Sequence, residues 1–321
     1  MKGTANTRIL KRSIIKHIKK GKALGVGVGN DFSTLSSSGD GFVSVSAMGA
    51  GESGETALLN AANNLATCGA EPTEMLVGIT AGEETPEQQI RDAMHSLTEE
   101  AGRYGIRIAG GNTFYSGQGA DLQFTVTLLG QAPEEYVSGR RSPRAGDKIV
   151  ISGFAGEYGA REIVKAKADD MTDRFAGSYL EGVISSEMEP YIKDTAGAFL
   201  ESGAVSVHDV SYGGIYRSLE EISERCSLGI RVIHERIPVR QSTIEICEYW
   251  NINPYMLLGT GSVVAVVPED KIEEMEKLLQ ERNIPYSVAG ELTKEGCREV
   301  VSQNSDMKRS LTYYEIDEIF K

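Results

Sequence analysis

The residues of this 321-residue chain that best fit a chemical role lie in one segment, His208-Asp209-Val210-Ser211-Tyr212-Gly213-Gly214-Ile215. An imidazole and a carboxylate stand there just before a double glycine. If a helix follows, glycines at its N-terminus leave amides free and let a phosphate approach them closely. His208 is a candidate proton donor or charge partner because imidazole titrates near neutral pH, but the structural interpretation is favoured over the chemical one. The segment therefore indicates either an anion-binding turn or an ordinary helix cap.

The elements that must position this segment follow from apolar spacing. Apolar residues recur at helical spacing after the double glycine, which predicts a helix over 214–226 with one buried face. That face consists of Ile215, Leu219, Ile222 and Cys226. Similar patterns predict helices over 57–66, 86–101, 190–202 and 269–282, and strands over 106–109, 122–129, 148–152, 229–234, 262–267 and 286–290.

The first half contains two helices whose ends are marked. An alanine-rich helix over 57–66 is ended by Gly69 and Pro72. The next begins at Thr85-Pro86-Glu87-Gln88, which predicts a capping box with proline at the first helical position. Its expected buried face consists of Ile90, Met94, Leu97 and Ala101.

Strands and helices interleave without a strict βαβ rhythm, which favours an α+β fold over a doubly wound sheet. The segment 138–147 is polar and contains glycine and proline, so we expect a domain boundary there. The predicted domains are 1–140 and 141–321.

Composition narrows the function. The net charge of −13 argues against general nucleic-acid binding. No apolar run reaches the roughly 20 residues that a membrane-spanning helix needs, and no secretory signal is visible. Four scattered cysteines predict no disulfide framework, so a cytoplasmic protein is expected. The basic N-terminal segment is predicted to be a solvated helix over packed isoleucines, or else an arm that docks a protein partner. Those isoleucines are Ile9, Ile14, Ile15 and Ile18.

Two glycine-rich segments fail as nucleotide motifs. Gly25–Gly29 lacks the strand before it and the helix after it that a dinucleotide fingerprint needs. Gly49–Thr56 carries Glu55 in place of the P-loop lysine, and a carboxylate would repel phosphates.

Four other segments, with the His208–Gly214 segment, form an ordered set: Gly29-Asn30-Asp31, Ser38-Gly39-Asp40-Gly41, Asn63-Asn64-Leu65-Ala66 and Gly110-Gly111-Asn112-Thr113, the last expected at the end of a strand. In this order they resemble the superfamily of aminoimidazole ribonucleotide (AIR) synthase, thiamin-monophosphate kinase, selenophosphate synthetase and the hydrogenase-maturation dehydratase HypE. The second half is most similar to HypE, through Ala145–Gly153, Gly156–Ala160, Ile237–Arg240 and Leu258–Val267.

The resemblance implies a two-domain α+β protomer and a homodimer whose N-terminal strands form a shared barrel. It implies ATP in a cleft at the dimer interface, Mg²⁺ held by aspartates, and activation of an amide-type or phosphate oxygen by phosphorylation. The implied metal ligands are Asp31, Asp40 and Asp209, and the implied catalytic residues are Asp209 and His208. The implied nucleotide-binding residues are Asn30, Asp31, Asp40, Asn64, Gly111, Asn112, Gly213 and Gly214.

The sequence also departs from the family pattern. Asn30, Asn64 and Asn112 stand where the family phrases carry aspartate. Mg²⁺ prefers charged oxygen ligands, so three neutral amides predict weakened or lost metal binding. HypE also works on a C-terminal cysteine, whereas this sequence ends Tyr314–Lys321 without one, so cyanide-ligand synthesis on its own C-terminal segment is not expected.

Two hypotheses follow. The chain is either an ATP-dependent enzyme of the HypE-like branch with an unknown substrate, or a non-catalytic dimeric scaffold with a degenerate nucleotide and metal site.

Overall fold

The computed structural model describes residues 9–18, 28–37, 41–117, 121–294, 296–306, 308–311 and 316–321. The chain divides into two compact units. Unit 1 comprises Met1–Lys19, Gly27–Gly29 and Arg141–Lys321, and unit 2 comprises Lys20–Val26 and Asn30–Arg140. The last change of unit, between Arg140 and Arg141, falls inside the polar segment 138–147.

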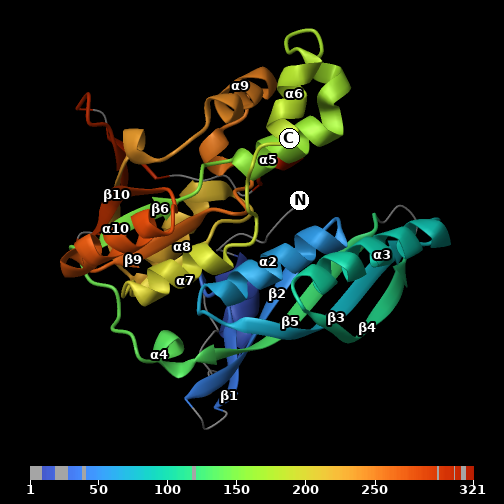
Figure 1. Cartoon of the computed structure of the whole chain (residues 1–321), viewed down its shortest axis with the longest axis horizontal. Helices are drawn as coiled ribbons and strands as arrows, with labels where there is room; N and C mark the ends of the chain where they lie inside the picture. The colour runs from blue at the N-terminus through green and yellow to red at the C-terminus, as the bar shows by residue number, and fades with distance from the viewer. Residues whose placement is uncertain are drawn as a thin grey trace. The chain divides into compact units, whose positions relative to one another are not determined.

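Unit 2 is built on a five-stranded sheet in the order β1-β2-β5-β3-β4. Its strands are β1 (Ser33–Ser37), β2 (Phe42–Gly51), β3 (Glu71–Gly82), β4 (Arg107–Ser116) and β5 (Gln123–Pro133). Only β3 and β4 pair in parallel among these neighbours. Figure 1 shows the helices α2 (Gly54–Ala66) and α3 (Glu87–Arg103) over one face of this sheet. The short helix α4 (Glu134–Val137) follows β5.

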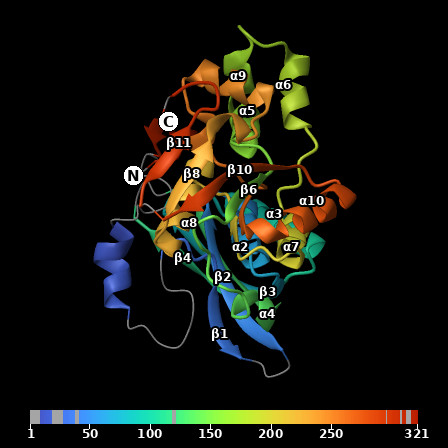
Figure 2. The same cartoon turned by 90° about the vertical axis from the view of Figure 1, so that its left-hand side faces the viewer.

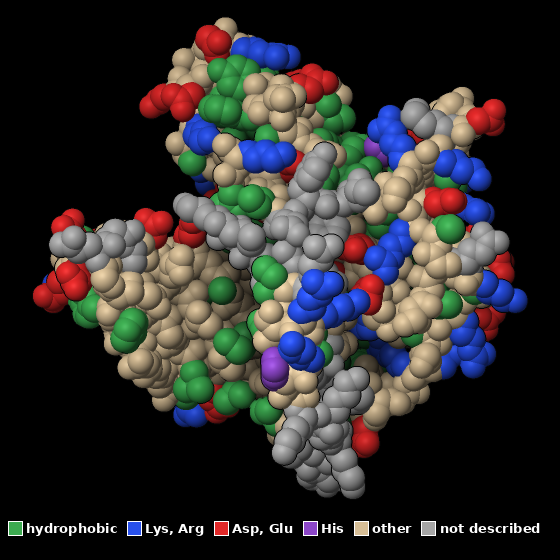
Figure 3. All heavy atoms as spheres, turned by 180° about the vertical axis from the view of Figure 1, so that it is seen from behind, with side chains coloured by type: hydrophobic (Ala, Val, Ile, Leu, Met, Phe, Trp, Pro, Cys, Tyr) green, Lys and Arg blue, Asp and Glu red, His purple; other side chains and the backbone are tan. Residues whose placement is uncertain are grey.

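The sheet of unit 2 has one buried face and one exposed face. Val45 of β2, Val126 of β5 and Met75 of β3 are fully buried on the helix side. The alternate positions point outward, as the two-residue period of a strand requires. Among them, Met48 and Leu76 are 62% and 43% exposed, and Phe114 of β4 is 61% exposed. Seen from behind, apolar side chains are scattered there among uncharged ones (Figure 3).

Three predictions for the first half need correction. Helix α3 begins at Glu87 with Pro86 as its N-cap residue, and no side-chain capping bond forms, so the predicted capping box is wrong. The carbonyl of Pro86 instead accepts the first helical hydrogen bonds. On the predicted buried face of α3, Leu97 and Ala101 are buried but Ile90 and Met94 only partly so. The Gly110–Thr113 segment lies within β4 rather than at a strand end, because parallel pairing with β3 continues to Ser116.

Unit 1 is built on a seven-stranded sheet in the order β12-β11-β8-β10-β6-β9-β7. Figure 2 shows β11, β8, β10 and β6 side by side. The strands are β6 (Lys148–Ser152), β7 (Ser206–Asp209), β8 (Gly229–Ile233), β9 (Val263–Val267), β10 (Tyr286–Thr293), β11 (Arg298–Val301) and β12 (Lys308–Ser310). The helices are α5 (Glu157–Lys167), α6 (Gly177–Ile184), α7 (Lys193–Glu201), α8 (Gly214–Cys226), α9 (Gln241–Trp250) and α10 (Ile272–Glu281).

Helix α8 begins at Gly214, as the apolar spacing predicts. Ile215, Leu219 and Ile222 are fully buried in the main core of unit 1, and Cys226 packs against it partly exposed. The predicted strands of the second half are present as β6, β8, β9 and β10, and the helices over 190–202 and 269–282 are present as α7 and α10. Two sheets with helices interleaved irregularly confirm the α+β prediction.

The basic N-terminal segment differs from its prediction. Residues Leu10–Ile14 form a short π-helix and Ile15–His17 a 3₁₀-helix. Ile9, Ile14 and Ile18 are 37–46% exposed, so the expected packing of these isoleucines is wrong. No described helix is both long enough and apolar enough to cross a membrane.

Candidate functional site

The turn between β7 and α8 has a backbone that requires its two glycines. Gly213 and Gly214 have φ values of +88° and +63°, in the region that favours glycine. A Cβ on Gly213 would meet the Arg217 side chain at 2.5 Å, and one on Gly214 would meet the carbonyl oxygen of Leu257 at 2.7 Å. The double glycine therefore has a packing reason of its own, independent of any ligand.

The two predicted catalytic residues end the buried strand β7. His208 and Asp209 are 3% and 4% exposed and pair with Val264 and Val263 of β9. The Ser218 hydroxyl of α8 donates to the carbonyl of Asp209 at 3.3 Å, so the start of the helix is fixed to the end of the strand. The fold thus brings His208, Asp209, Gly213 and Gly214 together in one β–turn–α segment.

A buried charge cluster surrounds His208. Its Nε2 lies 3.2 Å from one oxygen of Glu221, and the other oxygen accepts from Nε of Arg217 at 2.9 Å. Burial raises the pKa of Glu221, but the hydrogen bonds and charges of His208 and Arg217 outweigh burial and lower that pKa to about 2. Glu221 is therefore ionised at neutral pH. It holds both the imidazole and the guanidinium in place.

Sequence reasoning missed both Glu221 and Arg217. The available signal was their spacing of four residues, which places them as neighbours on one face of α8. Thirteen residues separate Glu221 from His208, and only the return of α8 past β7 brings the two side chains together.

The amides at the start of α8 are not free, which corrects the expectation drawn from the double glycine. The Gly213 amide donates to Oδ2 of Asp317, and the Gly214 amide donates to the carbonyl of Ser211 at 3.2 Å. Oδ1 of Asp317 accepts from the amides of Leu258 and Ile319, at 3.2 Å and 2.8 Å. A carboxylate from the end of the sequence therefore occupies the position where an anion was predicted.

Gly29, which precedes Asn30 and the predicted metal ligand Asp31, is held in unit 1. Gly29 has a φ of +73°, and its carbonyl accepts from Nη1 of Arg225 on α8 at 2.9 Å. A Cβ on Gly29 would lie 2.7 Å from the carbonyl oxygen of Glu221. Asn30 and Asp31 follow directly and belong to unit 2, where Asn30 is exposed and Asp31 is half-buried. The predicted ligand Asp40 lies outside the described residues.

The other predicted residues of unit 2 lie on separate elements. Asn64 sits on α2, where its amide nitrogen donates to the carbonyl of Met48 at 3.2 Å. Asn112 is exposed on β4 opposite Gly78. Gly111 beside it must be glycine, because a Cβ would lie 2.1 Å from the carbonyl oxygen of Val77. Asn64 and Gly111 thus have structural roles whether or not a nucleotide binds.

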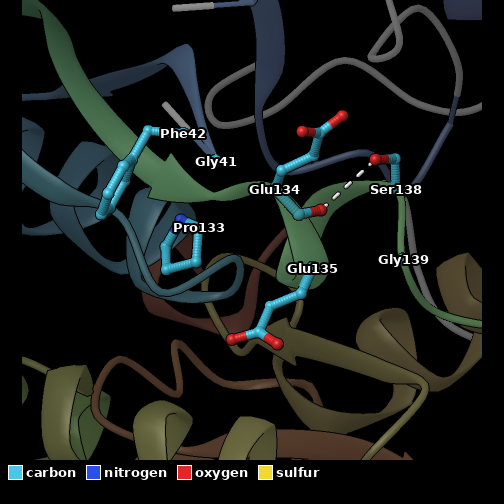
Figure 4. Close-up of a pocket in the computed structure, with 7 residues that line it drawn as sticks. All are labelled: Gly41, Phe42, Pro133, Glu134, Glu135, Ser138 and Gly139. Atoms are coloured by element: carbon cyan, nitrogen blue, oxygen red, sulfur yellow. Dashed lines mark hydrogen bonds between the residues drawn. The ribbon is translucent and has the colours of Figure 1, made fainter. Parts of the chain in front are cut away.

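A separate hollow of about 640 Å³ lies where β5 meets α4 (Figure 4). Phe42 and Pro133 line it together with two acidic residues, Glu134 and Glu135. The Ser138 hydroxyl, also in the lining, donates to the carbonyl of Glu134 at 3.3 Å. None of the described residues that line this hollow is basic, so its described lining does not favour a phosphate-bearing ligand.

The donor chemistry fits a divalent cation only in part. Carboxylate oxygens such as those of Asp209 and Asp31 are what Mg²⁺ prefers. Imidazole is a poorer ligand for this ion, and Nε2 of His208 already faces Glu221. Asn30, Asn64 and Asn112 offer only neutral oxygens. The described residues suit one cation bound by few charges better than a cluster of ions.

The two sheets, the glycine turn at α8 and the order of the motifs define an AIR synthase-like protein. The chain matches the model for the N-terminal domain of AIR synthase related proteins over residues 25–132 and the C-terminal domain model over residues 144–302. It therefore belongs to the AIR synthase related family, as the sequence motifs predicted.

Within that family the chain is similar to HypE. It is 25% identical over 235 residues to the carbamoyl dehydratase HypE of Azotobacter vinelandii, covering 70% of this chain and 64% of that protein. The match therefore spans a little less than two thirds of the relative's length. The HypE chain of a HypE–HypF complex superposes with a TM-score of 0.74 at 18% identity, covering 95% of this chain and 99% of that one. HypE in complex with ATP superposes with a TM-score of 0.66 at 19% identity, covering 98% and 93%. These two superpositions establish the shared fold.

Proposed function

We propose that this protein is an ATP-dependent enzyme of the HypE-like branch, which phosphorylates an amide-type or similar oxygen of its substrate to activate it. One observation carries the proposal: a buried aspartate, Asp209, stands at the end of β7 just before a glycine turn and a helix N-terminus. That arrangement places a carboxylate beside backbone amides, as phosphate and metal binding together require. The solved HypE complex with ATP supports the choice of nucleotide.

In this proposal Asp31, Asp40 and Asp209 hold one Mg²⁺. The bound ion would neutralise phosphate charge and orient the phosphates for transfer. Asn30, Asn64 and Asn112 act as neutral neighbours. They reduce the number of charges around the metal and also the repulsion of phosphate. Gly111, Gly213 and Gly214 let the backbone approach the nucleotide.

Glu221 is a positioning residue in this proposal. Its ionised carboxylate fixes the orientation of the His208 ring. His208 then presents a charge or a proton beside Asp209 without moving. Arg217 holds the second oxygen of Glu221, so the carboxylate cannot rotate away from His208.

We also propose that the protein is a homodimer formed through the outer face of the unit 2 sheet. The outward positions of β2 and β5 from Ser44 to Ala50 and from Thr125 to Gln131 carry no charge. Met48 and Leu76 flank Thr127 in one row across three strands, and both are exposed. An uncharged face with exposed apolar side chains is typical of a protein interface. The HypE–HypF complex supports a further, heterologous protein partner.

The alternative, a non-catalytic scaffold, is favoured by one observation: Asp317 already occupies the Gly213 amide. Calorimetric titration of the protein with ATP, ADP and a non-hydrolysable ATP analogue, each with and without Mg²⁺, separates the two functions. The enzyme proposal expects ATP binding that requires Mg²⁺. Binding that is independent of Mg²⁺, or no binding, would contradict it and favour the scaffold.

A further inference from the structure

The segment Ile316–Lys321 lies against the glycine turn of unit 1. Asp317 is 4% exposed, and its two oxygens accept from three amides, those of Gly213, Leu258 and Ile319. Two of these amides belong to loops far away in the sequence, one before α8 and one before β9. A single carboxylate therefore joins both loops to this segment.

Apolar contacts hold the same segment. The ring of Phe320 stacks on Tyr212 with centroids 5.6 Å apart and planes inclined by 21°. Ile319 packs against the second core of unit 1, which contains Ile246 and Leu257. Two apolar residues that follow Asp317 thus help to fix the segment at the turn.

The contact also carries a cost that favours release. Glu318 is 2% exposed, and among the described residues one of its oxygens has a partner, Nζ of Lys321 at 2.7 Å. Its other oxygen is buried without a hydrogen bond. A buried carboxylate oxygen with no donor is costly, and a second carboxylate stands next to it in Asp317. The segment is held by specific contacts and opposed by desolvation.

We propose that Ile316–Lys321 is an intramolecular strap that inhibits the site, with the Asp317 carboxylate occupying backbone amides that an oxyanion of the ligand must take. This rests on the proposed function, because it assumes that the glycine turn before α8 receives a phosphate. A phosphate of the nucleotide and an anionic group of the substrate would compete with Asp317 in the same way. Opening the strap frees the amides of Gly213 and Leu258 together.

The test compares Asp317→Asn with Asp306→Asn, which removes a charge from an exposed position. Amide hydrogen exchange without any ligand is measured over 206–219 and 250–262. The strap predicts at least about tenfold faster exchange at Gly213 and Leu258 in Asp317→Asn, and unchanged exchange in Asp306→Asn. Equal exchange in the two variants overturns the strap. Phe320→Ala removes the stacking on Tyr212 while keeping Asp317. Phe320→Ala is also expected to speed amide exchange at Gly213 and Leu258. It serves as the test variant if Asp317→Asn does not fold.

Binding then tests the inhibition. Inorganic phosphate, acetate and Mg²⁺-ATP are titrated into the same variants, to distinguish a phosphate, a carboxylate and the nucleotide as the competing group. The proposal expects at least one of the three to bind about tenfold more tightly to Asp317→Asn than to the wild type, with no change in Asp306→Asn. If no variant binds ATP while exchange rises and phosphate binds, the proposed function is wrong and the strap is correct. If ATP binds the wild type and Asp317→Asn equally, and phosphate and acetate do not discriminate, the inhibition is wrong and the function stands.

Discussion

The two halves of the predicted site differ in how their side chains are held. In unit 1, His208 and Asp209 are buried, and Glu221, Arg217 and Asp317 surround the same turn. In unit 2, Asn30 and Asn112 are exposed, and β4 is exposed along nearly its whole length. Unit 1 therefore holds its part of the site before any ligand arrives. The part in unit 2 is open, and in the proposed function the nucleotide and a second copy of the chain cover it.

The substitution of Glu221 should have the largest effect on stability, and it tests how firmly unit 1 holds its side chains. Glu221→Ala should lower the free energy of unfolding by roughly 4 kcal/mol, because it removes the carboxylate that His208 and Arg217 share in a buried site. Urea unfolding followed by circular dichroism measures it. Glu273→Ala, on the exposed face of α10, should change stability by less than about 0.5 kcal/mol. If Glu221→Ala lost no more stability than Glu273→Ala, the charge cluster of His208, Arg217 and Glu221 would not contribute to the stability of unit 1.

The pH dependence of stability tests the buried carboxylate at the turn. Burial raises the pKa of Asp317 from 3.8 to about 6, against the lowering effect of its three amide donors. The folded protein therefore holds a proton that the unfolded chain releases between pH 3.8 and 6. Stability contributed by this group is present below pH 3.8 and is lost as pH rises through about 6, by about 3 kcal/mol in total.

Asp317→Asn should remove this dependence, while Asp306→Asn should keep it. Urea unfolding is measured at intervals from pH 4 to pH 7 for both proteins. The free energy of unfolding of the wild type, relative to that of Asp317→Asn, should rise as pH falls. Parallel curves for the wild type and Asp317→Asn would show that Asp317 is not buried as described.

Alanine substitutions at two neighbouring glycines test how closely β4 pairs with β3 in unit 2. Gly111→Ala should cost roughly 2 kcal/mol, because its Cβ would lie 2.1 Å from the carbonyl oxygen of Val77. Gly110→Ala is the matched control, since its nearest neighbour is a Leu76 methyl group at 3.7 Å. Thermal or urea unfolding should separate the two variants. Equal stability would mean that β4 can move away from β3, and that its pairing is looser than described.

The smallest effect on folding should come from the exposed face itself. Met48→Glu should change the stability of the protomer by less than about 0.5 kcal/mol, since the side chain is 62% exposed. It should nevertheless halve the molecular mass in solution, because a charge would be buried in the proposed dimer. Light scattering coupled to size-exclusion chromatography measures the mass. A wild-type monomer, or a Met48→Glu dimer, would contradict this interface.

The sequence predicted the elements whose patterns are local. The start of α8 and the strands β6, β8 and β9 follow from periodicity and composition in short windows. Helices α5, α6 and α9, whose buried residues pack together in the second core of unit 1, were not predicted from the sequence. The predicted end of β4 was wrong because Gly110-Gly111 suggests a turn, whereas parallel pairing with β3 keeps this segment extended.

The candidate site was predictable only where its residues are adjacent in the sequence. His208–Gly214 and the family motifs mark positions directly. Glu221 reaches His208 only because α8 folds back past β7. Asp317 lies 104 residues from Gly213, whose amide it binds. No local pattern distinguishes a carboxylate that reaches a distant helix start from the other acidic residues of a chain with 46 of them. Contacts of this kind require the folded structure.

In the proposed function, Asp31 and Asp209 are ligands of one cation that accompanies ATP. A double-mutant cycle on the dissociation constant of Mg²⁺-ATP tests it most directly, with Asp31→Asn, Asp209→Asn and the double variant measured by calorimetry. If both carboxylates bind the same ion, each single change should weaken binding at least about tenfold, and the double change should weaken it little further. Wild-type binding that does not need Mg²⁺, or losses that add fully in the double variant, would contradict the claim.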